Sequence, residues 1–365
     1  MNAPLPDPAT LDPALRSLSA VRERLAAAGA RPAHADAVLR RWLGAVTKRR
    51  DEHWLPAGVR AGLPALLQGL DGLARVRDEH PAADGSSRLL VALADGQTVE
   101  SVLLPRDGVC VSSQVGCAVG CTFCMTGRGG LLRQLGSAEI AAQVVLARRR
   151  RPLRKVVFMG MGEPSHNLDA VMEAIELLGT VGGIGHKQLV FSTVGDERAF
   201  RRLPQGPVKP ALALSLHSVH AERRAALLPQ APRWAPAELL GTALGYAEST
   251  GHPLQVQWTL IEGVNDGEDE WRPLLPLLRG RRAVLNLIPY NRVDGVDFRR
   301  PDAERLRALV RRLHAGGVLT KLRQSAGQDV DAGCGQLRAR DLADPQRVRQ
   351  TAAGRTRLPP VVAAR

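Results

Sequence analysis

Residues 155–178 read KVVFMGMGEPSHNLDAVMEAIELL and contain one predicted strand followed by one predicted helix. The short run Lys155–Gly160 is rich in β-branched and aromatic residues, which is typical of a buried strand. After a turn containing Gly and Pro, apolar residues recur at helical spacing over Leu168–Leu178. A strand and helix in this order form one unit of a parallel α/β sheet.

The same alternation recurs on both sides of this stretch. Further strands are predicted at Gly108–Ser113, Gln188–Thr193, Ala211–Leu216, Leu254–Ile261, Ala283–Pro289 and Val318–Arg323. The intervening helices are predicted at Ala138–Arg151, Glu197–Leu203, Pro236–Thr250, Glu268–Leu278 and Asp302–His314. Repeated strand–helix units predict an α/β fold. Because the sequence has no dinucleotide-binding glycine motif, we expect this fold to be a partial (β/α)6-type barrel. In such a barrel the chemistry lies at the C-terminal ends of the strands.

The segments before and after the predicted barrel have different sequence patterns from the barrel itself. Helical apolar spacing with Gly or Pro stops predicts a helical N-terminal domain over residues 1–82, whose last helical stretch, AGLPALLQGLDGLARV, ends at residue 76. Asp95-Gly96 between two β-rich runs predicts a hairpin extension of the barrel domain, which spans residues 83–338. Residues 339–365 lack apolar periodicity and are rich in arginine, so we expect a flexible basic tail.

The composition is that of a globular protein and excludes a disordered or collagen-like chain. The 365 residues are 44% hydrophobic and 24% charged. Their formal net charge of +14 favours a polyanionic partner such as RNA or DNA, the alternative being a generally arginine-rich proteome. No stretch reaches the roughly 20 apolar residues of a membrane span. The N-terminus has early prolines and acids without an apolar core, so we expect no secretory signal and a cytoplasmic protein.

Three cysteines follow the first predicted barrel strand in the spacing C-x3-C-x2-C: Cys117, Cys121 and Cys124. In a reducing compartment such a cluster indicates metal binding or catalysis rather than disulfides. Three thiolates can hold a 4Fe–4S cluster with one iron open to a ligand. A zinc site completed by Cys110, or three structural cysteines, are the alternatives that spacing alone leaves open.

The arrangement Cys117-Ala-Val-Gly-Cys121-Thr-Phe-Cys124 resembles the radical S-adenosylmethionine (SAM) superfamily. Seven motifs in order narrow the resemblance: VCVSSQVGC, VVFMGMGEPSHN, FSTVG, LALSLH, GVNDG, NLIPYN and GQDVDAGCGQL. Together they resemble the adenine methyltransferases of ribosomal and transfer RNA, the RlmN/Cfr family, over about residues 83–338.

The resemblance implies a set of cofactor ligands. The three cysteines would hold a 4Fe–4S cluster, and two SAM molecules would be used per turnover, one as methyl donor and one as radical source. The predicted SAM-binding residues are Gly162, Glu163, Ser192, Ser215, Leu216, His217 and Asn291. Taken singly, a GMGEP turn or a histidine at a strand end is often purely structural.

The resemblance also implies three catalytic residues. Cys334, in DAGCGQL, would be the methyl carrier, and Cys110 would attack its sulfur and leave a disulfide as the product is released. Such a bridge requires the two α-carbons to come within about 7 Å. Glu100, in TVESVLLP, would accept a proton. The alternatives are a buried apolar thiol for Cys110 and a solvated strand carboxylate for Glu100.

The implied function is methylation of an adenine ring carbon, with C2 favoured, in 23S rRNA and possibly tRNA. A flavodoxin or ferredoxin would be the one-electron reductant, and we expect a monomer. The stretch RQSAGQDVDAG before Cys334 matches neither the C2-type nor the C8-type subgroup. Alternatives are therefore an adenine-C8 methyltransferase, a radical enzyme acting on another RNA or on a protein, and a zinc-stabilised RNA-binding protein.

Several basic stretches are candidate RNA contacts, although a run of charge is often only a solvated face. The candidates are Arg148–Arg151 with Arg154 and Lys155, Arg299-Arg300, Arg311-Arg312 and the tail. The N-terminal helices, with Trp42, Trp54 and Lys48–Arg50, would either grip the RNA or only cap the barrel.

Overall fold

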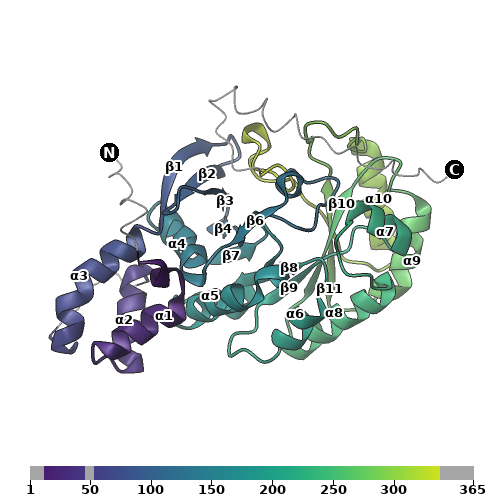
Figure 1. Cartoon of the computed structure of the whole chain (residues 1–365). Coiled ribbons are helices and arrows are strands. Elements are labelled where there is room, and N and C mark those ends of the chain that lie inside the picture. The colour runs from purple at the N-terminus through teal and green to yellow at the C-terminus, as the bar shows by residue number, and fades with distance from the viewer. Residues whose placement is uncertain (1–11, 46–52, 338–365) are drawn as a thin grey trace.

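The structure is a computed structural model that describes residues 12–45 and 53–337; the predicted tail and Lys48–Arg50 lie outside these ranges. A 3-10 turn and three helices form one end of the molecule (Figure 1): Pro13–Arg16, α1 (Leu18–Ala27), α2 (Pro32–Trp42) and α3 (Ala57–Asp71). Their buried apolar residues share one core with the sheet. The backbone N–H of Leu18 also donates to Ser137 Oγ (2.9 Å), which ties the start of α1 to the barrel.

One ten-stranded sheet runs through the rest of the molecule in the order β1-β2-β3-β4-β7-β8-β9-β10-β11-β12. The pairings from β1 to β4 are antiparallel, and those from β4 to β12 are parallel. The strands are β1 (Ala74–Pro81), β2 (Ser87–Leu93), β3 (Thr98–Leu104), β4 (Gly108–Cys110), β7 (Lys155–Phe158), β8 (Leu189–Thr193), β9 (Ala211–Ser215), β10 (Leu254–Leu260), β11 (Ala283–Pro289) and β12 (Thr320–Leu322). The predicted α/β fold is confirmed, and its parallel strands align their C-terminal ends along one edge.

Helices connect the parallel strands, and Figure 1 shows α5, α6 and α8 running along one side of the sheet. They are α4 (Ser137–Arg148), α5 (Leu168–Thr180), α6 (Glu197–Arg202), α7 (Ala221–Leu227), α8 (Pro236–Thr250), α9 (Glu268–Leu278) and α10 (Ala303–Ala315). Within the described ranges, no helix combines the length and the apolar character needed to cross a membrane.

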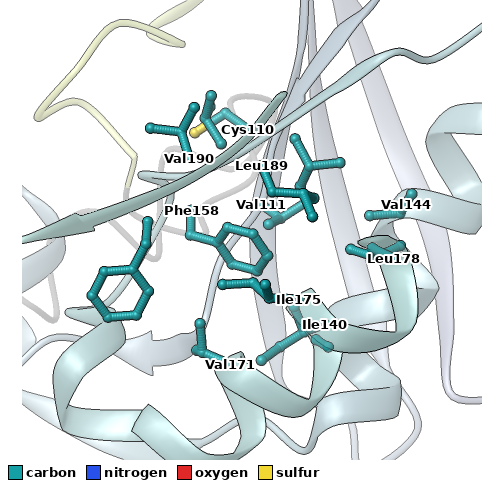
Figure 2. Close-up of a cluster of buried hydrophobic side chains, with 14 of the residues drawn as sticks. Cys110, Val111, Ile140, Val144, Phe158, Val171, Ile175, Leu178, Leu189 and Val190 are labelled. Atoms are coloured by element: carbon teal, nitrogen blue, oxygen red, sulfur yellow. The ribbon is translucent and has the colours of Figure 1, made fainter. Parts of the chain in front are cut away.

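Cross-strand register sorts the side chains onto the two faces of the sheet. Val102 pairs with Cys110, and Cys110 pairs with Val157, so these three side chains share one face. Phe158 alternates to the other face, where it lies among apolar residues of α4 and α5 such as Ile175 (Figure 2). The helix-covered face is therefore the main core, and the face that carries Cys110 is left for the site.

The structure differs from the predicted elements mainly at the antiparallel edge. The helix expected to reach residue 76 ends at Asp71, and Ala74–Pro81 forms a strand instead. Pairing with β2 gives this edge segment backbone hydrogen-bond partners along one side, which outweighs its helical apolar spacing. The strand expected at Gly108–Ser113 stops at Cys110, and a separate two-stranded sheet forms from β5 (Gln114–Gly116) and β6 (Leu131–Gln134). The domain limits at residues 82 and 338 stay predictions.

Candidate active site at the cysteine loop

Cys117, Cys121 and Cys124 lie on the loop after β5, and all three are half-buried free thiols. Two apolar residues of the loop, Val119 and Phe123, are buried in a second, smaller hydrophobic core. This packing fixes the backbone from which the three thiols project.

The three thiols are too widely spaced for a single zinc ion. Tetrahedral Zn–S bonds of about 2.3 Å place neighbouring sulfurs about 3.8 Å apart. Among the described residues, the one group of three His, Cys, Asp or Glu ligand atoms within 4.8 Å of one another is His220, Asp269 and Glu270. Arg223 already pairs with both of those carboxylates. A 4Fe–4S cluster is larger than one ion and is held by thiolates, so the spacing of the three thiols suits a cluster better than a single zinc ion.

The buried cation of the site is Arg224 on α7, which sequence reasoning missed because its surroundings look like an ordinary helix surface. Burial raises the pKa of Cys117 to about 12 and also raises the pKa of Cys121. Metal ligation needs thiolates, which a nearby cation favours. Burial lowers the pKa of Arg224 to about 10, while the nearby Cys121 and Glu163 act to raise it, so the guanidinium stays charged at neutral pH. It donates a hydrogen bond to the Val194 carbonyl oxygen.

Gly160 and Gly162 are glycines because another part of the chain fills the space beside them. A Cβ on Gly160 would lie 2.7 Å from Ser112 Oγ. A Cβ on Gly162, which has φ +102°, would lie 2.6 Å from Gln114 Cβ. The segment after β4 therefore accounts for both glycines, and contact between Gly162 and SAM stays a prediction.

Glu163 holds a buried carboxylate beside the cysteine loop. One carboxylate oxygen accepts hydrogen bonds from Ser165 Oγ (2.7 Å) and Ser165 N (3.2 Å), and the other accepts one from Val194 N (3.1 Å). Burial raises the pKa of Glu163, and its charge acts on both Cys117 and Cys121. The segments after β7 and β8 thus fix the Glu163 carboxylate, and its contact with SAM stays a prediction.

The predicted SAM-binding serines lie at the C-terminal ends of β8 and β9. Val190 pairs with Val157, so Ser192, two residues further on, shares the face of Cys110. Ser192 pairs with Ala213, which places the half-buried Ser215 on that face as well. Leu216 alternates into the hydrophobic core and is fully buried. Its side chain therefore faces away from the side of Ser192 and Ser215.

His217 joins the cysteine loop to the neighbouring strand. It is buried, and its ring lies edge-on to Phe123 with centroids 4.8 Å apart. Its Nδ1 accepts a hydrogen bond from Thr259 N (2.9 Å), which leaves the proton of the neutral ring on Nε2. Burial, assisted by Arg224, lowers the pKa of His217 to about 3. The residue therefore has a structural role that is independent of any ligand.

The loop that carries Cys334 is docked directly on the cysteine loop. Met125 N donates to the Gly335 carbonyl oxygen (2.7 Å), and Thr126 Oγ1 donates to the Leu337 carbonyl oxygen (2.7 Å). From the loop after β11, Asn291 Nδ2 donates to the Cys334 carbonyl oxygen (3.0 Å). The predicted SAM ligand Asn291 therefore also positions the predicted methyl carrier.

Cys334 is exposed, but the surrounding protein raises the pKa of its thiol, an effect that Arg323 opposes. Its charge acts in turn on Cys110, the last residue of β4, which belongs to the buried cluster of Figure 2. Burial raises the pKa of Cys110 to about 12. Both cysteines are free thiols, so the disulfide implied by the resemblance has no support in this structure.

Glu100 is fully buried, and the alternative of a solvated strand carboxylate is wrong. Its carboxylate forms an ion pair with the equally buried Arg88. Arg88 pairs with Val102 across the sheet, and Val102 pairs with Cys110. Alternation along β3 therefore puts Glu100, Arg88 and Cys110 on one face.

Each guanidinium group of the predicted patch Arg148–Arg151 already has a partner within the protein, and two of the four are paired with acids. Arg149 pairs with Asp71 (2.6 Å), and Arg150 pairs with Glu79 (2.8 Å). The other two guanidinium groups donate to backbone carbonyl oxygens. The neighbouring Lys155 is half-buried on the face of Cys110, where burial lowers its pKa.

The remaining candidate contacts are dispersed. Trp42 is buried in the N-terminal helices, whereas Trp54 is 45% exposed and packs edge-on to His34. Arg312 on α10 lies over the ring of Trp271. Arg299 and Arg300 line a pocket beside the Cys334 loop.

Comparison with known proteins agrees with this site. The Radical SAM superfamily matches residues 111–270, which include the cysteine loop. A probable RNA methyltransferase of Methylibium petroleiphilum is 68% identical over 88% of this chain and 92% of its own, and one of Pseudomonas aeruginosa is 63% identical over 88% and 94%. The crystal structure of a radical SAM methyltransferase from Sphaerobacter thermophilus has a TM-score of 0.78 and 36% identity, covering 89% of this chain and 98% of that one. The chain therefore belongs to the radical SAM superfamily and, within it, to the family of these probable RNA methyltransferases.

Proposed function

We propose that the protein is a radical SAM methyltransferase that methylates carbon 2 of an adenine in RNA, with 23S rRNA as the first substrate and tRNA as a second. The observation that supports this most is the docking of the Cys334 loop on the cysteine loop through Met125 and Thr126. A nucleophilic thiol held beside a cluster-binding loop suits a methyl carrier. The names of the relatives support RNA as the substrate class.

The residues have separate tasks in this proposal. Cys117, Cys121 and Cys124 hold the cluster, which together with SAM supplies an electron and the methyl group. Glu163, with the strand-end residues Ser192, Ser215 and Asn291, holds SAM. Cys334 accepts the methyl group as a thiolate. Burial raises the pKa of this thiol, and the nearby Arg323 opposes the rise. Cys110, close enough to interact electrostatically with Cys334, serves as the second redox cysteine.

Glu100 is proposed as the proton acceptor, and its ion pair with Arg88 fixes its position on the face of Cys110. A flavodoxin or ferredoxin as reductant, two SAM molecules per turnover and a monomeric enzyme complete the proposal. The C8 position of adenine is the second candidate, because the stretch before Cys334 matches neither subgroup.

The test compares wild-type protein with the Cys334→Ala variant, both purified anaerobically and incubated with SAM, reductant and 23S rRNA. Mass spectrometry of the digested RNA should find 2-methyladenosine for the wild type and only background for the variant. The variant should keep the wild-type iron content, since Cys334 is outside the C-x3-C-x2-C set.

The other outcomes are equally informative. 8-Methyladenosine would replace the C2 assignment by C8 while keeping Cys334 in its role. Methylation by Cys334→Ala would overturn the methyl-carrier role. A wild-type protein that cleaves SAM but methylates neither 23S rRNA nor tRNA would contradict the proposed substrates.

A further inference from the structure

A pocket of about 570 Å³ opens between the loop after β11 and the Cys334 loop. Its walls come from residues 290–292 and 296–300 on one side and from Gln328 and Gln336 on the other. Asn291 is the single predicted SAM ligand in this lining, and its amide nitrogen is already bonded to Ser325 Oγ and the Cys334 carbonyl oxygen. The pocket therefore adjoins the proposed SAM site through Asn291, while its other lining residues are not predicted SAM ligands. Gln336, in its second wall, belongs to the Cys334 loop.

The pocket is rich in arginine. Arg292, Arg299 and Arg300 line it and are exposed. Over residues 12–45 and 53–337, none of the three pairs with a carboxylate, and Arg300 donates only to Gln328 Oε1 (3.5 Å). One carboxylate, Asp297, also lines the pocket.

The cysteine loop contributes a fourth arginine. Arg128 Nη1 lies 3.2 Å from the position that a Cβ on Gly295 would occupy. Arg128 and Arg292 both act electrostatically on Tyr290, and Asp294 acts on it in the opposite sense. Among the described residues, four guanidinium groups thus lie at or beside this pocket with three carboxylates, since Asp331 accepts a hydrogen bond from the lining residue Gln336. This leaves an excess of positive charge beside Cys334.

Hydrogen bonds and ring packing within the protein hold the walls of the pocket in place without a ligand. Glu262 N donates to the Arg299 carbonyl oxygen (3.0 Å), and Phe298 packs edge-on to Tyr290 with centroids 5.8 Å apart. Gln336 Nε2 donates to the Arg292 carbonyl oxygen (3.2 Å) and so links the two walls. A preformed site loses less conformational entropy when it binds.

We propose that this pocket binds the sugar and phosphate of a nucleotide next to the methylated adenosine, with Arg299 and Arg300 on the phosphate. This inference rests on the proposed function. The planar guanidinium group of arginine can donate two parallel hydrogen bonds to phosphate oxygens. The volume of the pocket lies in the range of small-ligand sites. A target base must be turned out of its stack to reach the mouth of a barrel, so the adjacent nucleotides need a binding site of their own. The pocket offers such a site beside the Cys334 loop.

The test measures binding of a fluorescent single-stranded RNA of about 12 nucleotides to the cluster-loaded full-length protein, without SAM or reductant. The Arg299→Ala/Arg300→Ala variant should bind about tenfold more weakly at moderate salt. The slope of log K against log salt should fall by about 0.7, because one phosphate contact is lost. The control, Arg201→Ala/Arg202→Ala at the exposed end of α6, removes the same formal charge, with Arg201 paired to Glu197, and should behave as wild type.

A second variant, Arg299→Lys/Arg300→Lys, keeps the charge and should keep the salt slope while losing part of the affinity. Iron content and SAM cleavage without RNA verify that each variant is folded. Equal weakening by the α6 control, or an unchanged affinity and slope for Arg299→Ala/Arg300→Ala, would overturn the inference. Because RNA binding is measured without turnover, a wild type that binds through these arginines but methylates no RNA would contradict only the proposed function.

Discussion

His217 has the most unusual backbone and side-chain surroundings of the candidate site residues. Its φ of +61° is rare for a residue other than glycine. The ring is buried between Phe123 and the backbone of Thr259, to which it is bonded through Nδ1. The hydrogen bond and the packing hold this conformation. The sequence shows a histidine at a strand end but gives no sign of this geometry.

The buried neutral ring predicts an acid-sensitive contribution to stability. The folded-state pKa of His217 is about 3, below its ordinary value of 6.5, so the unfolded chain binds more protons between these pH values. The contribution is complete above pH 6.5 and is lost as pH falls toward 3. Between pH 7.5 and pH 5 this histidine should lower the free energy of unfolding by ~2 kcal/mol.

Urea denaturation of wild type and His217→Gln at both pH values measures this contribution. Other groups also titrate, so the informative quantity is the difference in pH dependence between the two proteins. The wild type should lose more stability on acidification than the variant. Identical losses would show that a charged His217 is tolerated in the fold.

Glu100 illustrates what single residues reveal before a structure is known. Its strand, Thr98–Leu104, is the second of the two β-rich runs that flank Asp95-Gly96 in the predicted hairpin. Its partner Arg88 was not predicted, because the contact depends on the register between β2 and β3. A strand pattern gives the alternation of faces but not which charges meet across the sheet.

Among the structural elements, the contact between the cysteine loop and the Cys334 loop matters most. The sequence motifs identified each loop, but the two are separated by about 200 residues of chain. Gly335 lies at the junction, with φ +85° and with the Phe123 carbonyl oxygen 2.7 Å from where a Cβ would be. The close approach of the two backbones explains the glycine.

Gly335→Ala should therefore separate the two loops. The added methyl group strains the left-handed backbone and collides with the Phe123 carbonyl oxygen. Methylation of RNA should therefore fall at least tenfold, which corresponds to a barrier increase of about 1.4 kcal/mol. The iron content should stay at the wild-type level. Gly280→Ala is the matched control, since Gly280 has φ +73° and no atom within 4 Å of its Cβ position. The control should lose about 1 kcal/mol of stability and keep its activity, as measured by methyl incorporation and urea denaturation. Equal activity in the two variants would show that the loops need not touch.

The parallel strands and their helices were predictable because nearly continuous apolar runs alternate with helical spacing. Ala283–Pro289 and Pro236–Thr250 have the predicted limits, and most other elements differ by a few residues at their ends. The missed strands are polar or very short, as in Ala74–Pro81 and Gln114–Gly116. Such segments become strands through their partners, so their own residues carry little signal.

Over the whole molecule, the net charge of +14 does not indicate where RNA binds. The longest predicted patch, Arg148–Arg151, meets acids from other elements, Asp71 of α3 and Glu79 of β1. Those elements lie about 70 or more residues earlier in the chain, so the sequence could not show the neutralisation. Arg299 and Arg300, by contrast, gather with further arginines at one pocket.

Because, among the described residues, one pair of arginines is paired with acids and the other is not, removing either pair should affect RNA affinity differently. Arg149→Ala/Arg150→Ala removes two positive charges but exposes two acids, so it should cost about 0.2–1 kcal/mol of stability per ion pair. Its RNA affinity at moderate salt should stay within about twofold of wild type, since a carboxylate next to each guanidinium already cancels its field within a Debye length. The same RNA titration measures both pairs of arginines. A fall in the salt slope for Arg149→Ala/Arg150→Ala would mean that RNA displaces Asp71 and Glu79 from their partners, because only a phosphate in direct contact releases counterions on binding.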